Sequence, residues 1–146
     1  MFASRARYAL RAALWLADRY PRFASAHRVA EGLAASPKFM ESILTDLSHQ
    51  GLLVSQRGRA GGYRLARPPA SVSVLDIVNA SGVRLWSHEC SPDSPACQGC
   101  DRVATCKVRL LLADCRGALE ASLAAQTLDG LRPPPGAVRP PLQPPS

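Results

Sequence analysis

The spacing of apolar residues along this chain changes from a helical period to a two-residue alternation and then back again. Apolar positions recur every three or four residues over residues 4–20, in a shorter segment that begins after Ser25, and over residues 39–47. This spacing is typical of amphipathic helices that turn one face toward a core. Pro21 ends the first helix, because proline removes a backbone donor and restricts the residue before it.

Capping residues mark where the second and third helices begin. Ser25 can cap the second helix, and a Ser36-Pro37 pair is a start signal for the third, which Gly51 closes. Two short helices with a tight connection are the helix-turn-helix layout. Its second helix is predicted to bury Phe39, Met40, Ile43, Leu44 and Leu47. Its outward stripe, at spacings of three, four and seven residues, is predicted to carry Lys38, Glu41, Ser42 and Thr45.

A β-hairpin is predicted directly after these helices. Residues 52–56 and 63–66 have strand composition, and the loop over residues 57–62 is basic and rich in glycine. A hairpin with Arg57 and Arg59 at its tip, placed after a helix-turn-helix, is a wing. Either arginine can enter a minor groove, where the negative potential of DNA is enhanced.

Helical spacing returns in the second half of the chain. Ser73 and Asp76 form a capping-box pattern for a helix that runs to about Ala80, whereas residues 87–105 have loop composition. Residues 106–125 are predicted to form a long helix, and Thr127 to cap a last turn. The apolar stripe of that long helix is Val108, Leu111, Leu112, Cys115, Leu119 and Leu123. Little chain remains to cover this stripe, so we interpret it as a dimer seam, with packing on the winged domain as the alternative.

We therefore expect a mainly α fold with a small β-hairpin wing, which is a winged helix-turn-helix plus a long C-terminal dimerisation helix. The predicted divisions are a DNA-binding domain over residues 1–82, a cysteine-rich cluster-binding loop over 83–106, a dimerisation helix over 107–131, and a tail over 132–146. The tail holds seven prolines in fifteen positions and is expected to be disordered.

The distribution of charge points to a polyanionic partner. Residues 1–70 contribute the whole net charge of +7, with 11 Lys/Arg against 4 Asp/Glu. Residues 71–146 hold 7 Lys/Arg and 7 Asp/Glu and are neutral overall. Nucleic acid is the first candidate, and an anionic membrane surface or an ordinary solvated face are the alternatives. No apolar run is long enough to span a membrane, and Arg11 interrupts the leader-like start, so a cytoplasmic protein is expected.

Five cysteines in a chain without a recognisable secretion signal imply reduced thiols, and therefore metal or redox chemistry. Cys90, Cys97, Cys100 and Cys106 fall within seventeen residues. Thiolates suit an iron–sulfur cluster because soft, charged ligands match its core. A zinc site and bare thiol redox switching remain the alternatives, although the spacing is not that of common zinc ribbons. Cys115 is interpreted as a small core residue on the apolar face of the long helix.

Several motifs together resemble one bacterial family, the Rrf-type (IscR/NsrR-type) winged-helix regulators. The resemblance rests on RYALR over residues 7–11, SPKFME over 36–41, GLL over 51–53, RG at 57–58 with GGYRLARP over 61–68, DIV over 76–78, the cysteine loop, and TLDGL over 127–131. It covers residues 2–131 in family order. The wing sequence in combination with the cysteine loop makes it specific.

The resemblance implies a homodimeric transcription regulator, in the first instance a repressor, that binds a two-fold related site on double-stranded DNA. It implies that a 2Fe–2S or 4Fe–4S cluster in the cysteine loop responds to iron, oxygen, nitric oxide or redox state and controls DNA affinity. A regulator switched by zinc or by thiol oxidation is the alternative. No nucleophile–base pair or substrate-pocket signature is present, so an enzyme is not expected.

The resemblance also implies a ligand set for the cluster. Cys100 and Cys106 have the family's separation for the last two ligands, and Cys90 lies upstream. Family members that use a fourth protein ligand take a histidine or a first-helix carboxylate, and this chain has Arg109 and Arg7 at those positions. Cys97 is the expected substitute, with Glu89, His88 or an exogenous ligand as the alternatives.

On the DNA side, Lys38, Ser42 and Thr45 can reach phosphates or bases. Glu41 would repel phosphates unless it accepts a hydrogen bond from a cytosine amino group, so it would act as a selector of sequence. An ordinary solvated charge is the alternative for Glu41. The complete set of candidate DNA-binding residues is Arg5, Arg7, Tyr8, Ser25, His27, Ser36, Pro37, Lys38, Glu41, Ser42, Thr45, Arg57, Gly58, Arg59, Gly61, Gly62 and Tyr63.

Overall fold

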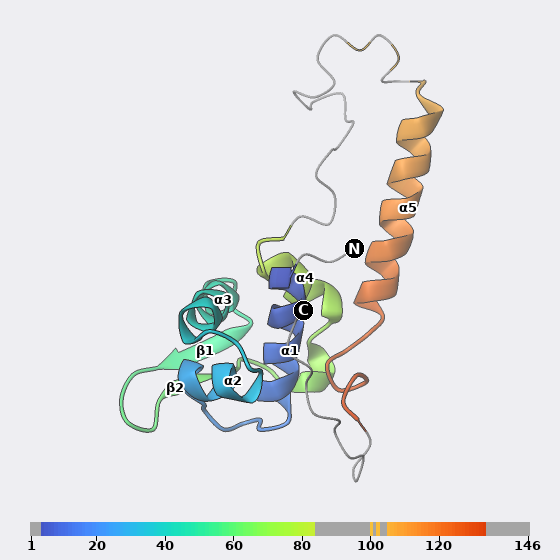
Figure 1. The fold of residues 1–146 in the computed structure, drawn as a ribbon. Coiled ribbons are helices and arrows are strands. Elements are labelled where there is room, and N and C mark those ends of the chain that lie inside the picture. Colours follow the sequence, from blue (N-terminus) through green and yellow to red (C-terminus); the bar gives the residue numbers. More distant parts are fainter. Residues whose placement is uncertain (1–3, 84–99, 101, 103–104, 134–146) are drawn as a thin grey trace.

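The computed structural model describes residues 4–83, 100, 102 and 105–133. Its elements in chain order are α1 (Ser4–Ala17), α2 (Ala26–Gly32), α3 (Pro37–His49), β1 (Leu53–Gln56), β2 (Gly62–Leu65), the 3₁₀ turn η1 (Pro69–Ser71), α4 (Val74–Ala80) and α5 (Lys107–Ala124). Helices α1 to α4 and the hairpin gather into one body, and α5 stands beside it (Figure 1). The predicted order of helices, hairpin and long C-terminal helix is confirmed.

Helix α1 packs against α2, α3, α4 and β2, and the face that it turns to them is made mostly of small side chains. Ala6, Ala9, Ala12 and Ala13 are each 0% exposed, and Leu16 is 1% exposed. The distance between packed helices depends on the side chains at the contact, so alanines allow the neighbouring elements to approach closely. This close approach brings three other helices and a strand around one short helix.

Helix α1 ends at Ala17 and not, as the apolar spacing predicted, at Tyr20. The Arg19 N–H donates to the Leu16 carbonyl at 3.0 Å and the Tyr20 N–H donates to the Ala17 carbonyl at 3.3 Å, which is the three-residue spacing of a tight turn. Because Pro21 disfavours helical conformation at the residue before it, the helix unwinds ahead of the proline.

The predicted caps of α2 and α3 are present. Ser25 Oγ accepts from the Arg28 N–H, and Ser36 Oγ accepts from the Phe39 N–H, both at 3.3 Å. Pro37 occupies the first position of α3, where its missing donor is not needed. The two helices pack on each other across a short connection and form the predicted helix-turn-helix.

The wing is an antiparallel hairpin that is joined to the helical body by one additional bridge. Leu53 pairs with Leu65 at its base, and Gln56 pairs with Gly62 toward its tip. Beyond the hairpin, the Tyr63 N–H donates to the Ala24 carbonyl at 2.8 Å and the Ala24 N–H donates to the Tyr63 carbonyl at 3.0 Å. The chain just before α2 therefore adds a third, very short partner to the edge of the wing.

Helix α4 begins with the predicted capping box. Ser73 Oγ accepts from the Asp76 N–H at 3.1 Å, and Asp76 Oδ2 accepts from the Ser73 N–H at 3.0 Å. These reciprocal bonds satisfy two donors that the first turn of a helix leaves open. The helix ends at Ala80, and Ser81 follows it almost completely buried, with 1% of its surface exposed.

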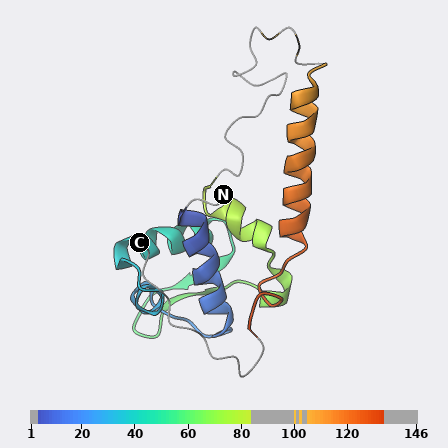
Figure 2. The same cartoon turned by 45° about the vertical axis from the view of Figure 1, so that its right-hand side comes forward.

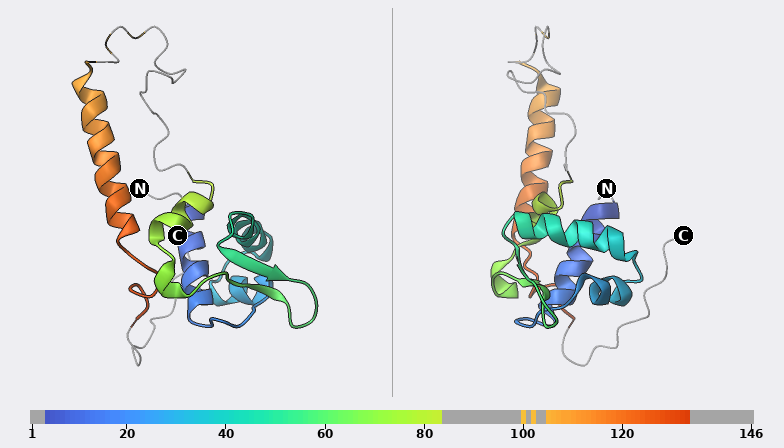
Figure 3. Two further views of the ribbon diagram at one scale, coloured as in Figure 1. Left: turned by 180° about the vertical axis from the view of Figure 1, so that it is seen from behind. Right: turned by 90° about the vertical axis from the view of Figure 1, so that its left-hand side faces the viewer.

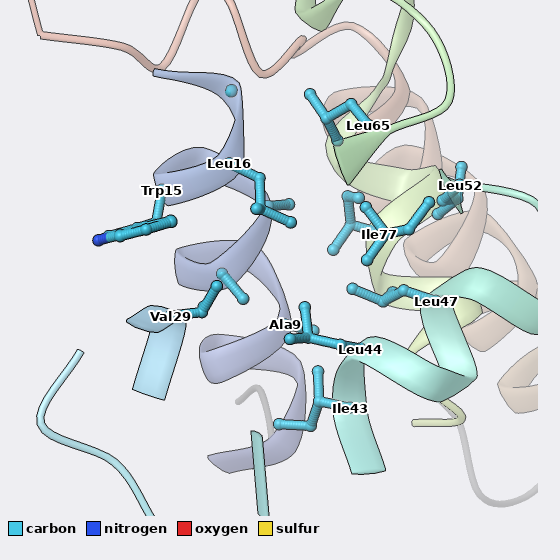
Figure 4. Packing of buried hydrophobic residues seen from close by; sticks show 14 of the residues in the cluster. Ala9, Trp15, Leu16, Val29, Ile43, Leu44, Leu47, Leu52, Leu65 and Ile77 are labelled. Carbon is cyan, nitrogen blue, oxygen red and sulfur yellow. The ribbon is translucent and has the colours of Figure 1, made fainter. Parts of the chain in front are cut away.

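One apolar core connects all the elements of the winged body (Figure 4). Leu16 from α1, Leu44 and Leu47 from α3, Leu65 from β2 and Ile77 from α4 are at most 1% exposed. Phe39, which was predicted to be buried with the rest of its face of α3, is only half-buried. It lies at the rim of the core, with its ring edge-to-face against Tyr8 at 5.4 Å between centroids.

Helix α5 is arranged differently from the other helices. None of its residues is buried, and it extends along and past α4 away from the wing (Figures 2 and 3). Val108 is 63% exposed and Leu111 is 61% exposed. The alternative interpretation of the apolar stripe was a core helix packed on the winged body. Within the single chain α5 is not such a core helix. No helix among the described residues is both long and apolar enough to cross a membrane.

The chain after α5 returns to the winged body. The Val74 N–H donates to the Gln126 carbonyl at 2.8 Å, and the Leu128 N–H donates to the Val72 carbonyl at 2.9 Å. The side chain of Leu128 is 0% exposed and belongs to the main core. Thr127 caps the following turn as predicted, since its Oγ1 accepts from the Gly130 N–H at 3.2 Å. This segment was predicted to belong with the long helix, but it packs on the winged body and holds the C-terminal end of α5 there.

We predict that Leu128→Ala lowers the free energy of unfolding by about 2–5 kcal/mol, because it leaves a cavity at a fully buried leucine. Leu131→Ala is the matched control, since Leu131 is 44% exposed and its truncation should change stability by less than about 0.5 kcal/mol. Urea unfolding monitored by tryptophan fluorescence measures both variants. Equal stabilities for the two variants would contradict the docking of this segment.

Candidate DNA-reading surface and cysteine segment

The outward side of α3 carries the polar groups that the sequence placed there. Lys38, Glu41 and Ser42 are exposed, whereas Thr45 is half-buried. Thr45 Oγ1 lies 3.2 Å from the Tyr63 hydroxyl, with which it shares a hydrogen bond. The first two turns of α3 therefore present exposed polar side chains, and the third turn is joined to the wing.

The two arginines of the wing loop are exposed. Arg57 and Arg59 lie between β1 and β2, with Gly58 between them at a φ of 107°. The left-handed region favours glycine, and a Cβ added at Gly58 would meet nothing within 4 Å. Gly58 therefore serves the turn of the loop, and the space beside it is open.

Gly61 and Gly62 have a different role, which is to let backbones approach. A Cβ at Gly61 would lie 2.1 Å from the Gln56 carbonyl oxygen, and a Cβ at Gly62 would lie 2.2 Å from the Ala24 carbonyl oxygen. Gly62 also has a φ of 127°. A side chain at Gly62 would push the wing away from the chain that precedes α2, whereas a side chain at Gly61 would clash with β1 and distort the hairpin itself.

Tyr63 joins three parts of this surface. Its backbone bonds to Ala24 ahead of α2, its hydroxyl bonds to Thr45 on α3, and its half-buried ring packs on the core. The wing and α3 are thus held in one geometry in the free chain. This placement makes Tyr63 a residue that orients the surface.

Arg5 is engaged by partners within the chain. Its Nη2 donates to the Ser42 hydroxyl at 3.1 Å and forms an ion pair with Asp46, and its Nε donates to the Ser81 carbonyl at 3.1 Å. Arg5 is predicted from the sequence to contact DNA, and its pairing with Asp46 and Ser81 is not signalled there. Residues far apart in the sequence meet here, and no local pattern signals such a meeting.

The other two candidates from the first helix, Arg7 and Tyr8, differ in their surroundings. Arg7 is exposed, and its Nη2 donates to the Ser4 hydroxyl at 3.4 Å. Tyr8 is half-buried between the Phe39 ring and the Arg11 guanidinium, which lies 5.4 Å from the centroid of the Tyr8 ring. Arg7 therefore presents its charge to solvent, while Tyr8 packs between neighbours.

The remaining candidates lie at the starts of α2 and α3. Ser25 and Ser36 are exposed but use their hydroxyl oxygens as helix caps, and Pro37 begins α3. His27 is exposed on α2. Arg28, next to it, is exposed as well, and the sequence analysis did not select it. The signal that could have identified Arg28 as a candidate DNA contact is its position next to His27 on the first helix of the helix-turn-helix.

A second basic group lies at the end of α1. The Arg19 guanidinium stacks on the Trp15 ring at 3.5 Å from its centroid and donates to the Trp15 carbonyl at 3.0 Å. Partial burial lowers the pKa of Arg19, and the nearby charge of Arg28 lowers it further. Gly32 faces the same indole, because a Cβ there would lie 2.3 Å from Trp15 Nε1.

Two of the four candidate cluster ligands are described. Cys100 is exposed, and Cys106 is half-buried at the N-cap of α5, and both are free thiols. Cys90, Cys97 and the alternative ligands His88 and Glu89 lie outside the described residues, as does the Pro-rich segment 134–146. Within the described part of the chain, no three His, Cys, Asp or Glu side chains gather as a metal site.

Cys115 differs from its expected placement. It was interpreted as a small core residue, but in the single chain it is an exposed, free thiol on α5. The reason is that α5 has no buried face of its own, so a residue on its apolar stripe is covered only if another surface packs there.

A winged helix-turn-helix with these exposed basic groups defines a class of protein, the DNA-binding transcription regulators. A family model described as the Rrf2 iron-dependent transcriptional regulator matches residues 2–133, and the chain belongs to this family. An rrf2-like HTH-type transcriptional regulator of Rhodobacter capsulatus is 32% identical over 120 residues, which are 78% of this chain and 80% of that protein. Protein rrf2 of Nitratidesulfovibrio vulgaris is 29% identical over 103 residues, 70% of this chain and 67% of that protein.

Solved structures support the same fold. CymR of Staphylococcus aureus is 27% identical and covers 94% of this chain and 100% of its own, with a TM-score of 0.67. The structure of IscR from T. potens is 22% identical in sequence, and the match covers 90% of this chain and 85% of that protein with a TM-score of 0.69. The predicted fold class and family resemblance are confirmed, and so is the prediction that the chain is a regulator and not an enzyme.

Proposed function

We propose that this chain acts as a homodimeric transcription regulator, in the first instance a repressor, whose affinity for double-stranded DNA is controlled through its cysteine segment. The observation that carries the proposal is the surface formed by α3 and the wing. Exposed Lys38, Glu41 and Ser42 on α3 and exposed Arg57 and Arg59 in the wing belong to two elements that Tyr63 holds together. A helix for the major groove and a basic loop for the minor groove or the phosphates are the parts that winged-helix recognition needs.

The unpartnered apolar stripe of α5 supports the dimer. Monomeric proteins rarely expose large contiguous apolar surfaces, and here Val108, Leu111 and Leu112 are 63%, 61% and 42% exposed. A second copy of α5 crossing the first would cover this stripe, with Cys115 inside the seam. Two-fold symmetry would then place two α3 helices for the two halves of a two-fold related DNA site.

An iron–sulfur cluster is the cofactor that fits the donor set best. Cys100 is a free, exposed thiol and Cys106 is a free, half-buried thiol at the N-cap of α5, and the sequence supplies two more thiols, Cys90 and Cys97, ahead of them. Soft thiolate ligands are those that bind 2Fe–2S and 4Fe–4S clusters. When bound, such a cluster would supply a charge and coordination state that changes with iron, oxygen, nitric oxide or redox potential. The family's description as iron-dependent agrees with this assignment.

Switching by zinc or by thiol oxidation is the second candidate. Four thiolates also satisfy zinc. One similar solved structure is that of the oxidized form of Staphylococcus aureus CymR, which is 26% identical and covers 96% of this chain with a TM-score of 0.67. The visible spectrum of anaerobically purified protein, with iron and sulfide counts, separates the two candidates, because an iron–sulfur protein is brown and a zinc or thiol protein is colourless.

We predict that Arg57→Ala and Arg59→Ala each weaken binding to duplex DNA and reduce the salt dependence of the association constant. Each lost phosphate contact should lower the slope of log K against log salt by about one unit, because fewer counterions are released. Lys107→Ala, which removes the same charge at the start of α5, is the control and should leave the slope unchanged. Slopes for both wing variants equal to that of the wild type would remove the wing from the interface.

Glu41→Ala should have a different effect. Removing the carboxylate removes a group that repels phosphates and that is tolerated where it accepts from a cytosine amino group, so sequence preference should relax while overall affinity stays equal or rises. Binding to a randomised duplex pool, followed by sequencing of the bound fraction, measures this preference. A uniform loss of binding to all sequences would show that Glu41 is not a selector.

The cysteine variants test the ligand assignment. Cys90→Ala, Cys100→Ala and Cys106→Ala should each bleach the visible absorption, because an iron site that loses a thiolate becomes labile. Cys97→Ala should do the same if Cys97 is the fourth ligand, whereas Cys115→Ala should keep the colour. Anaerobic spectra and iron content of the five single variants decide the assignment. A brown Cys97→Ala protein with full iron would assign the fourth position to Glu89, His88 or an external ligand.

A further inference from the structure

One guanidinium connects three helices of the winged body. Arg5, in the first turn of α1, donates to the Ser42 hydroxyl and pairs with the Asp46 carboxylate, one turn apart on α3, and donates to the Ser81 carbonyl at the end of α4. We call these four residues the Arg5 clamp. The side chain of Arg5 is 30% exposed and that of Asp46 is 45% exposed, so the clamp is partly screened by solvent.

The α4 side of the clamp is rigid. Ser81 is 1% exposed, its N–H donates to the carbonyls of Ile77 and Val78, and its hydroxyl donates to the Val78 carbonyl at 2.7 Å. Its own carbonyl lies where the negative end of the helix dipole attracts a cation. A displacement of the end of α4 therefore moves the acceptor of Arg5 Nε with it.

The α3 side of the clamp lies on the reading surface. Ser42 is an exposed member of the outward stripe, between Glu41 and Thr45 along the helix. Because the guanidinium is planar and its donors have a fixed arrangement, Arg5 cannot follow a shifted Ser81 carbonyl without changing its bonds to Ser42 and Asp46. The clamp therefore makes the position of α3 depend on the position of the end of α4.

The chain that leaves α4 leads directly to the cysteines. Ser81 precedes Cys90 by nine residues, and no other described element lies between them. The same end of α4 is thus the point at which the cysteine segment joins the winged body. Ligation or oxidation of the cysteines that displaced the chain after Ser81 would also displace the Ser81 carbonyl, which is the acceptor of Arg5 Nε.

We propose that Arg5 is a positioning residue that couples the state of the cysteine segment to the orientation of α3. This inference rests on the proposed function, in which the cysteines control DNA affinity. Arg5 acts through Ser42 and Asp46, and its effect on DNA is indirect. Coupling between two sites of a protein typically changes affinity by roughly 5–150-fold, and this ratio should depend on Arg5.

The test compares wild type, Arg5→Gln, Arg5→Lys and a control in two states of the full-length protein. The states are iron-loaded and chelator-treated, or reduced and peroxide-oxidised if the protein purifies without iron. Arg67→Gln is the control, because Arg67 forms a similar exposed ion pair with Asp76 of α4 at 3.5 Å but none with α3 in the described structure. Two measurements are made in each state: the affinity for a duplex that the wild type enriches from a random pool, and amide hydrogen exchange across α3.

We expect the DNA affinity and the amide hydrogen exchange of α3 to differ between the two states in both the wild type and Arg67→Gln. Arg5→Gln should show an affinity ratio near one and no change in α3 exchange. Arg5→Lys, which keeps the charge but loses the planar donors, should show a reduced ratio. A purely structural role would lower stability and affinity equally in both states and leave the ratio unchanged, and that result would overturn the proposal.

The remaining outcomes separate this inference from the proposed function. If the wild type binds DNA with the expected salt dependence but shows no change in α3 exchange between states, the coupling is wrong and the DNA-binding function stands. If α3 exchange changes in an Arg5-dependent way but no duplex binds, the coupling stands and the proposed function is wrong. Should Arg5→Gln fail to fold, Asp46→Ala removes the acceptor that Arg5 pairs with on α3, and an unchanged ratio in that variant overturns the proposal.

Discussion

The close packing of α1 is the constraint on which the rest of the structure depends. Four alanines on this helix are completely buried, and they bring α2, α3, α4 and β2 to one short helix. Protein cores are packed so densely that even one additional methylene is felt. Larger side chains at these positions would separate the elements that carry the reading surface. The geometry of α3 and the wing therefore depends on alanines that are completely buried and cannot themselves contact DNA.

The wing and α3 are adjusted to each other by backbone proximity. Because Gly62 has no Cβ, its backbone can lie close to the Ala24 carbonyl. The next residue, Tyr63, bonds to the Ala24 backbone and places its hydroxyl against Thr45. The free chain thus presents a surface that is already organised, and such preorganisation reduces the entropy lost on binding. Regulation of this surface then requires a movement of α3 or of the wing as a whole, which is the kind of movement that the proposed coupling through Arg5 would transmit.

The two parts of the chain that lie outside the winged body depend on additional components. Helix α5 has an apolar stripe and no buried residue, and the described thiols Cys100 and Cys106 are free. The return of Leu128 into the core anchors the base of α5. A second chain and a bound cofactor are the partners that complete these segments in the proposed regulator.

The sequence by itself determined the local elements, because their signals are local. The Ser25 and Ser36 caps, the Ser73–Asp76 capping box and the glycine-rich loop between two strands each depend on residues a few positions apart, and each is present as predicted. The family resemblance depended on the same short motifs. Only the tertiary structure decided that Arg5 pairs with Asp46 and Ser81, that Leu128 returns to the core, and that Cys115 is exposed in the single chain. These features join residues up to 76 positions apart or depend on what covers a helix face, and neither is encoded in the spacing of neighbouring residues.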